Sequence, residues 1–245
     1  MFHISNYKKD VAEGNFISIA RAISSIENEE AEVEDFLSNL TPSAIPVIGI
    51  TGPPGAGKST LISSLIGNYV LQNKKVAVIS VDPSSVKHKG ALLGDRIRMK
   101  DWYLHPSVYI RSLASRLHLG GLVKSTHKIV KFLKSTGFDI VILETVGVGQ
   151  SEVEVASVAN PTLLVLVPEA GDDIQMMKSG LFEVANIFVV NKSDRADAKK
   201  FLSHLKISLN DRIQSGEKIG IIETVANTGQ GIEELDNCIK RFLIQ

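Results

Sequence analysis

Cysteine is almost absent from this 245-residue sequence, in which Cys238 is the single example. One cysteine excludes an internal disulfide and any cysteine-cluster metal site. Long apolar runs are missing too, because no stretch approaches the roughly 18 residues of a membrane-spanning helix. The first ten residues are polar and charged, unlike a signal sequence. We therefore expect no membrane partner, and the cytoplasm is the default location.

A surplus of either charge is also lacking, since 27 lysines and arginines balance 27 aspartates and glutamates. A general nucleic-acid-binding protein needs a basic surplus or a concentrated basic face. No nucleic-acid partner is therefore expected. The length suits one α/β domain that buries a full core, with a short segment to spare.

The sequence does contain a phosphate-binding loop between a predicted strand at 45–50 and a helix that runs to about residue 72. Its glycines let several backbone N–H groups turn toward a polyphosphate, and the helix adds its positive end. Lys58 is expected to reach the β- and γ-phosphates, and the Ser59 hydroxyl to ligate Mg²⁺. The loop predicts a nucleoside triphosphate site formed by Gly52, Pro53, Pro54, Gly55, Ala56, Gly57, Lys58, Ser59 and Thr60.

Six further apolar segments predict an α/β fold with a doubly wound, mostly parallel sheet. Before the first strand, apolar residues recur at helical spacing in 16–26 and 33–40. We interpret residues 1–41 as a helical N-terminal extension and 42–245 as the nucleotide-binding domain. Packing of the extension against the domain and binding of a partner are both open roles for it. The six segments are 75–81, 108–113, 138–143, 162–167, 186–190 and 218–224.

The predicted strand at 138–143 leads directly into Glu144. A carboxylate there suits a nucleoside triphosphatase, because Mg²⁺ needs an oxygen ligand opposite Ser59. Gly147 follows three residues later and can place its N–H against the γ-phosphate. Val148 occupies the position where small signalling GTPases have a water-positioning glutamine, so slow intrinsic turnover is expected.

The tetrapeptide Asn191-Lys-Ser-Asp194 after the sixth strand predicts the base. The Asp194 carboxylate can accept hydrogen bonds from N1–H and the exocyclic amine of guanine, whereas adenine presents an acceptor at N1. The Lys192 stem can lie along the base, and Asn191 can link this segment to the phosphate loop. After the seventh strand, backbone N–H groups are expected to close over the guanine. They belong to Val225, Ala226 and Asn227, so the site is predicted to bind GTP and GDP.

Five segments together resemble one family. The sequence is similar, over about residues 15–235, to the GTPase chaperones associated with methylmalonyl-CoA mutase, a coenzyme B12-dependent enzyme. This family, of the SIMIBI type, also carries an older label as a lysine/arginine/ornithine transport ATPase or kinase. The segments are Gly-Pro-Pro-Gly-Ala-Gly-Lys-Ser-Thr (52–60), Val-Asp-Pro-Ser-Ser (81–85), Leu-Gly-Asp-Arg-Ile-Arg-Met (93–99), Glu-Thr-Val-Gly-Val-Gly-Gln-Ser-Glu (144–152) and Asn-Lys-Ser-Asp (191–194).

The resemblance implies a Mg²⁺-dependent GTPase that binds an adenosylcobalamin-dependent mutase. Its nucleotide state would gate cobalamin loading and the removal of damaged cofactor. By motif match, the catalytic residues are Lys58 and the carboxylates Asp82, Asp95 and Glu144, which together with Ser59 surround the metal and the attacking water. The resemblance also implies three switches, at 93–99, 147–150 and 171–175.

The sequence departs from the family at Lys89, Leu117 and Glu169, where glycine is common. Because Lys89 replaces one of those glycines, the first switch is expected to be stiffer and more basic. Family members often continue into a helical arm used for dimerisation, whereas this sequence ends at Gln245. A homodimer without that arm, through another surface, stays open.

Two other functions stay open as alternatives. A metallochaperone GTPase for nickel enzymes would present clustered histidines and cysteines, but the six histidines are scattered along the sequence. His118, beside two glycines, is the one histidine with a candidate role in a site. A transport-associated nucleotidase or kinase is disfavoured, because no phosphoacceptor machinery is recognisable and Asn191-Lys-Ser-Asp194 disfavours ATP.

Overall fold

A seven-stranded sheet lies at the centre of the protein in a computed structural model, which describes residues 10–11, 14–82, 99–114, 119–145, 153, 158–168 and 180–244. The strand order is β3-β2-β4-β1-β5-β6-β7, and all six neighbouring pairs are parallel. β1 is therefore central, between β4 and β5. The strands are β1 (Val47–Thr51), β2 (Val76–Asp82), β3 (Val108–Ala114), β4 (Ile140–Thr145), β5 (Thr162–Leu166), β6 (Ile187–Asn191) and β7 (Gly220–Thr224).

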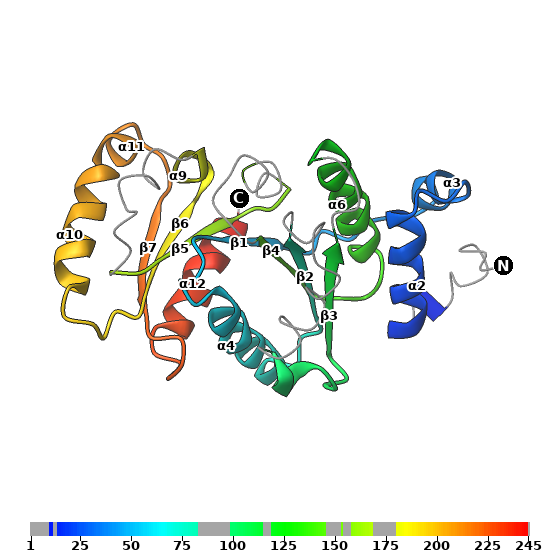
Figure 1. Cartoon of the computed structure of the whole chain (residues 1–245), viewed down its shortest axis with the longest axis horizontal. Coiled ribbons are helices and arrows are strands. Elements are labelled where there is room, and N and C mark those ends of the chain that lie inside the picture. The colour runs from blue at the N-terminus through cyan, green and yellow to red at the C-terminus, as the bar shows by residue number, and fades with distance from the viewer. Residues whose placement is uncertain are drawn as a thin grey trace.

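Helices cover both faces of the sheet (Figure 1). One face packs against α4 (Lys58–Leu71) and α12 (Ile232–Leu243). The opposite face packs against two groups of helices, one at each end of the sheet. These are α2 (Phe16–Glu27), α3 (Val33–Ser38) and α6 (Leu119–Leu133) at one end, and α9 (Gly180–Val184) and α10 (Ala198–Ser208) at the other. The short helix α11 (Asn210–Gln214) follows α10, and a 3-10 turn, η3 (Lys100–Trp102), precedes β3.

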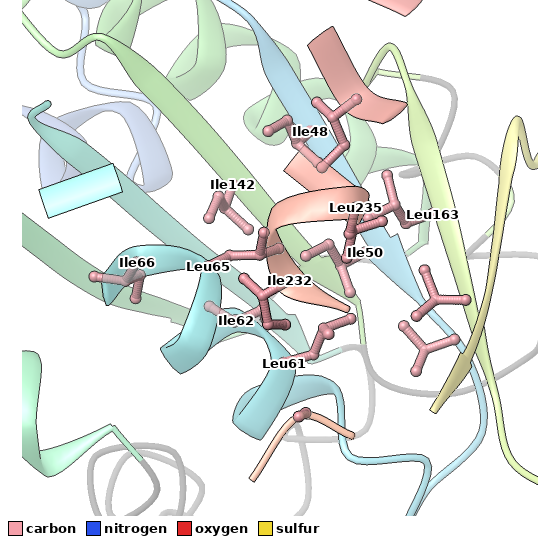
Figure 2. Close-up of a cluster of buried hydrophobic side chains, with 14 of the residues drawn as sticks. Ile48, Ile50, Leu61, Ile62, Leu65, Ile66, Ile142, Leu163, Ile232 and Leu235 are labelled. Carbon is pink, nitrogen blue, oxygen red and sulfur yellow. The ribbon is translucent and has the colours of Figure 1, made fainter. Parts of the chain in front are cut away.

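Two core layers follow from the alternation of side chains along each strand. In β5, Leu163 and Val165 join the layer under α4 and α12, whereas Leu164 and Leu166 join the layer under α9 and α10. Because both faces are covered, the inner strands β1, β4, β5 and β6 are buried along their whole length rather than at alternate residues. Figure 2 shows the first layer, where Leu61, Ile62 and Leu65 of α4 meet Ile232 and Leu235 of α12 beside Ile48 and Ile50 of β1.

The N-terminal helices share a hydrophobic cluster with α6 and the sheet. Ile19, Ile23 and Ile26 of α2 are fully buried in it. Arg111 of edge strand β3 donates to the Ala20 carbonyl at 2.8 Å and forms an ion pair with Glu27. The α2 helix is thus packed against the sheet, while the predicted boundary at residue 41 stays a prediction.

The doubly wound parallel sheet predicted from the sequence is confirmed, and each strand lies within two residues of its predicted bounds. Three helices, α9, α10 and α11, were not predicted. Phe201 and Leu205 of α10 and Leu209 after it are apolar and recur every four positions, which is the signal that the interpretation overlooked. No helix in the described part of the chain is long and apolar enough to span a membrane.

Candidate nucleotide-binding site

The predicted site segments follow the carboxyl ends of the parallel strands, which lie at one edge of the sheet. The phosphate loop (52–59) comes after β1, Glu144 is the next-to-last residue of β4, and Asn191 ends β6. A second loop, residues 225–227, comes after β7 and is called the base loop below. In open parallel sheets this edge is where ligands bind, next to the point at which the strand order reverses.

Two glycines of the phosphate loop stand where no side chain fits. Gly52 has a φ of 142°, and a Cβ there would lie 2.3 Å from the Val165 carbonyl oxygen. Gly57 has a φ of 87°, and its Cβ would lie 2.5 Å from Asn191 Nδ2. Positive φ and close backbone approach both favour glycine. The loop can therefore pass against β5 and Asn191 before α4 begins at Lys58.

The Lys58 side chain is held inside the phosphate loop. Its ammonium donates to the carbonyl oxygens of Gly52 at 2.7 Å and Pro53 at 3.0 Å, and the residue is buried. Ser59, Ala56 and Pro53 are buried as well, whereas Pro54, Gly55 and Thr60 are exposed. The positive charge and the N-terminal end of a 14-residue helix thus lie together, as an anion-binding loop requires.

Glu144 connects the phosphate loop with strand β2. Its Oε1 atom accepts from Ser59 Oγ at 3.1 Å, and its Oε2 atom accepts from Ser80 Oγ at 2.9 Å. All three residues are buried, and Ser80 lies opposite Glu144 in the register of β2 and β4. A buried hydroxyl and carboxylate in contact are hard oxygen donors, the kind that Mg²⁺ takes from a protein alongside nucleotide phosphates. The donors present at this point therefore fit Mg²⁺.

Asn191 joins three separate segments. Its Nδ2 atom donates to the Ala56 carbonyl at 2.9 Å. Its Oδ1 atom accepts from Thr224 Oγ1 and from the Ala226 backbone N–H, each at 3.1 Å. The side chain is buried, so these bonds are made away from water. The phosphate loop, the end of β7 and the base loop are thus held at one amide group.

Lys192 and Asp194 follow on the same loop. Lys192 has a φ of 57°, and its ammonium donates to the Gly55 carbonyl at 2.9 Å. The lysine side chain therefore extends from the end of β6 to the phosphate loop. Asp194 is exposed, so its carboxylate is accessible to a ligand. Ser193 between them donates from its backbone N–H to the Thr224 carbonyl at 3.1 Å.

The three predicted base-loop donors differ in their existing partners. The Val225 N–H donates to the Gln230 carbonyl at 3.0 Å, and the Ala226 N–H donates to Asn191. Val225 and Ala226 are buried, whereas Asn227 is exposed. Among the described residues, the Asn227 N–H has no hydrogen-bond acceptor. Of the three predicted donors, the Asn227 N–H is therefore the one that can donate to a base.

Several predicted residues cannot be placed. Asp95, Gly147 and His118 lie outside the described residues, as do the predicted switches at 147–150 and 171–175 and all of 93–99 except Met99. For Asp82 the structure gives the backbone at the end of β2 but not the side chain. Their roles stay predictions.

Sequence reasoning missed Ser80, Thr224 and Ser64. Ser80 and Thr224 bond to the predicted site residues Glu144 and Asn191. Ser80 is a polar residue within the buried apolar run 76–81, and that contrast was a readable signal, whereas Thr224 follows the exposed Glu223 and shows no such contrast. Ser64, which contacts the base loop, lies on a half-buried helix face and likewise gave no local signal.

Comparison with known proteins identifies the family. The family model described as Methylmalonyl Co-A mutase-associated GTPase MeaB matches residues 19–244. A relative from Pyrococcus horikoshii, whose name describes it as a GTPase, is 45% identical over 233 residues, or 93% of this chain and 74% of that protein.

Solved structures agree on the fold. The crystal structure of LAO/AO transport system kinase has a TM-score of 0.73 at 23% identity and covers 99% of this chain and 76% of that one. HypB from Helicobacter pylori in complex with nickel has a TM-score of 0.58 at 16% identity and covers 90% and 94%. At these identities the likeness shows a shared fold.

Proposed function

The chain belongs to the methylmalonyl Co-A mutase-associated GTPase family, and we propose that it uses GTP hydrolysis to gate the loading and protection of cobalamin in a coenzyme B12-dependent acyl-CoA mutase. The family name supports a mutase of the methylmalonyl-CoA type as partner. The observation that carries the nucleotide half of the proposal is the Asn191 amide. It holds the phosphate loop against the base loop, which supports a site that takes both ends of one guanine nucleotide.

Each end of the nucleotide meets a different chemistry. The polyphosphate would take the N–H groups of the phosphate loop and the Lys58 ammonium in place of the Gly52 and Pro53 carbonyls. The guanine would meet the exposed Asp194 carboxylate, which accepts from N1–H and the exocyclic amine. An adenine would leave that hydrogen-bonding capacity unpaired, and such mismatches discriminate by roughly 10⁴-fold or more.

Mg²⁺ would be held by Ser59 and, directly or through water, by Glu144. When bound, it supplies neutralisation of the charge on the β- and γ-phosphates. Ser80 orients the second Glu144 oxygen and so keeps the first directed at Ser59. In the hydrolysis itself a water oxygen bonds to the γ-phosphorus, the bond to the bridging oxygen breaks, and GDP, inorganic phosphate and one proton from the water leave. Asp82 and Asp95 are proposed to complete the carboxylate set.

The partner is tested by GTP turnover with and without the cobalamin-dependent acyl-CoA mutase of the same organism, with ATP as the nucleotide control. Stimulation of GTP turnover alone, together with a stable complex, supports the proposal. Glu144→Gln should abolish the stimulated rate while leaving the complex intact. GTP turnover that is indifferent to the mutase, with no complex, would leave a GTPase with another client.

The predicted preference for guanine is tested by changing the hydrogen-bonding groups of the side chain at position 194. In Asp194→Asn the side-chain amide can donate to the C2 carbonyl of xanthine, whereas it no longer accepts two bonds from guanine. We expect the ratio of the affinity for GDP to the affinity for xanthosine diphosphate to fall by at least about 100-fold. Asp197→Asn, an exposed aspartate three residues on, is the matched control and should keep the GDP preference. Retention of that preference in Asp194→Asn would contradict the assignment.

The alternatives receive no separate support. Among the described residues, no group of three or more histidine, cysteine, aspartate or glutamate side chains could hold a nickel ion. The likeness to HypB and to the transport system kinase extends to the fold. The metallochaperone and kinase functions therefore stay as unfavoured predictions.

A further inference from the structure

Ser64, on the second turn of α4, reaches across to the base loop. Its hydroxyl donates to the Ala226 carbonyl at 2.6 Å, although the two residues are 162 positions apart. The adjacent Ser63 is equally half-buried but turns elsewhere, because its hydroxyl accepts from Trp102 Nε1 at 2.9 Å. One helix thus begins at the phosphate loop and donates a side-chain hydrogen bond to the base loop.

The contact fixes the orientation of one peptide group. The Ala226 carbonyl and the Asn227 N–H belong to the same planar unit, and in a trans peptide they point in opposite directions. Ser64 holds the carbonyl toward α4, so the Asn227 N–H must point away from α4. The preceding peptide is held as well, because the Ala226 N–H donates to Asn191. The direction of the Asn227 N–H is therefore fixed by these two hydrogen bonds.

Further contacts along the same stripe of α4 restrain the helix that follows the base loop. Asn68 and Gln72, four and eight residues after Ser64, donate to Asp236 Oδ2 at 2.9 and 3.1 Å. Asp236 lies on α12, which starts five residues after Asn227. Positions four apart lie on one face of a helix. The base loop is thus held to α4 at its own carbonyl and again one turn into α12.

We infer that Ser64 is a positioning residue for guanine recognition, which holds the 226–227 peptide so that the Asn227 N–H donates to the O6 atom of the base. The inference rests on the proposed guanine-nucleotide site. Without the hydroxyl, the Ala226 carbonyl loses its partner on α4 and the peptide can rotate. Recognition of O6 should then weaken, while Asp194 still recognises the N1 and amine side of the base.

The test compares three diphosphates that differ only in the base. GDP and IDP both carry O6, whereas 2-aminopurine riboside diphosphate lacks it. Affinities of the full chain are measured by competition against a fluorescent GDP analogue. Ser64→Ala should lower the affinity for GDP and for IDP by about 3- to 10-fold, which corresponds to one neutral hydrogen bond. It should change the affinity for the 2-aminopurine nucleotide by less than about twofold. Ser64→Thr, which keeps the hydroxyl, should restore GDP affinity.

Ser63→Ala is the matched control, because it removes a hydroxyl of the same type from the same helix turn without a contact to the base loop. It should leave all three affinities unchanged. Equal weakening of the three nucleotides by Ser64→Ala would show a general structural effect and overturn the inference, as would unchanged binding. If the unaltered chain binds no guanine nucleotide in preference to ADP, the proposed function fails instead.

Discussion

The Nδ2 atom of Asn191 donates to the carbonyl oxygen of Ala56 at 2.9 Å, across 135 positions of sequence. The same side chain accepts from the Ala226 N–H on its other side. A nucleotide bound between these segments would meet a phosphate loop and a base loop that share one buried support. Binding of the phosphate and of the base should therefore depend on the same residue.

Asn191→Ala should weaken both stability and nucleotide binding. The substitution leaves the Ala56 carbonyl, the Thr224 hydroxyl and the Ala226 N–H without their buried partner, and each unsatisfied group costs roughly 1–3 kcal/mol. We expect the free energy of unfolding in urea to fall by at least about 2 kcal/mol and GDP affinity to fall at least about tenfold. Asn237→Ala, at an exposed position of α12, should change neither.

Gly52→Ala should cost more than the strain of positive φ alone. A Cβ at residue 52 would lie 2.3 Å from the backbone oxygen of Val165, which cannot move without displacing β5. Gly216 also has positive φ, at 87°, but its Cβ would meet nothing within 4 Å. We expect Gly216→Ala to cost about 1–3 kcal/mol in urea unfolding and to keep GDP binding. Gly52→Ala should exceed that cost and abolish binding; equal costs would show that the loop adjusts freely.

Ile23→Ala tests whether α2 is part of the folding unit. Ile23 is fully buried in the cluster that α2 shares with α6 and the sheet, so its truncation should cost about 2–5 kcal/mol. Ile17, on the same helix, is 66% exposed, and Ile17→Ala should change little. The measurement is urea unfolding followed by far-UV circular dichroism and by Trp102 fluorescence. Two separate transitions, with Ile23→Ala affecting only one, would show that the N-terminal helices unfold independently.

Asp236 should make stability fall at acid pH. Burial acts to raise the pKa of its carboxyl, but hydrogen bonds from Lys240, Gln72 and Asn68 outweigh burial and hold the pKa below its ordinary value. A lowered folded-state pKa contributes stability that is present above the unfolded-state pKa, about 3.9, and is lost as the pH falls through the folded-state value. We therefore expect the urea midpoint to decrease below about pH 4.

Asp236→Asn removes that titration. The variant should be less stable than the unaltered chain at pH 7, by about 1–3 kcal/mol, because Lys240 loses a buried carboxylate partner. Its stability should change less steeply with pH in the acid range. Asp211→Asn, at an exposed position of α11, controls for the loss of one negative charge. Parallel pH profiles for Asp236→Asn and the unaltered chain would contradict the prediction.

The strand, loop and helix around Lys58 and the tetrapeptide beginning at Asn191 could be predicted because their signals are local. Backbone conformation and burial leave periodic patterns over five to fifteen residues, and a phosphate loop needs its glycines and lysine at set spacings. The sequence alone thus determined the nucleotide class, the parallel sheet and the family resemblance, which the family model confirms over residues 19–244.

The tertiary structure decided how these pieces meet. Apolar strands of similar composition give no local indication of their order, so the central place of β1 depends on long-range pairing and on the helices above it. Ser80 beside Glu144 follows from strand register, and Ser64 beside Ala226 follows from the packing of α4 against α12. A hydrogen bond between residues far apart in the sequence requires two atoms to approach to about 3 Å, and a short stretch of sequence gives no information about that distance.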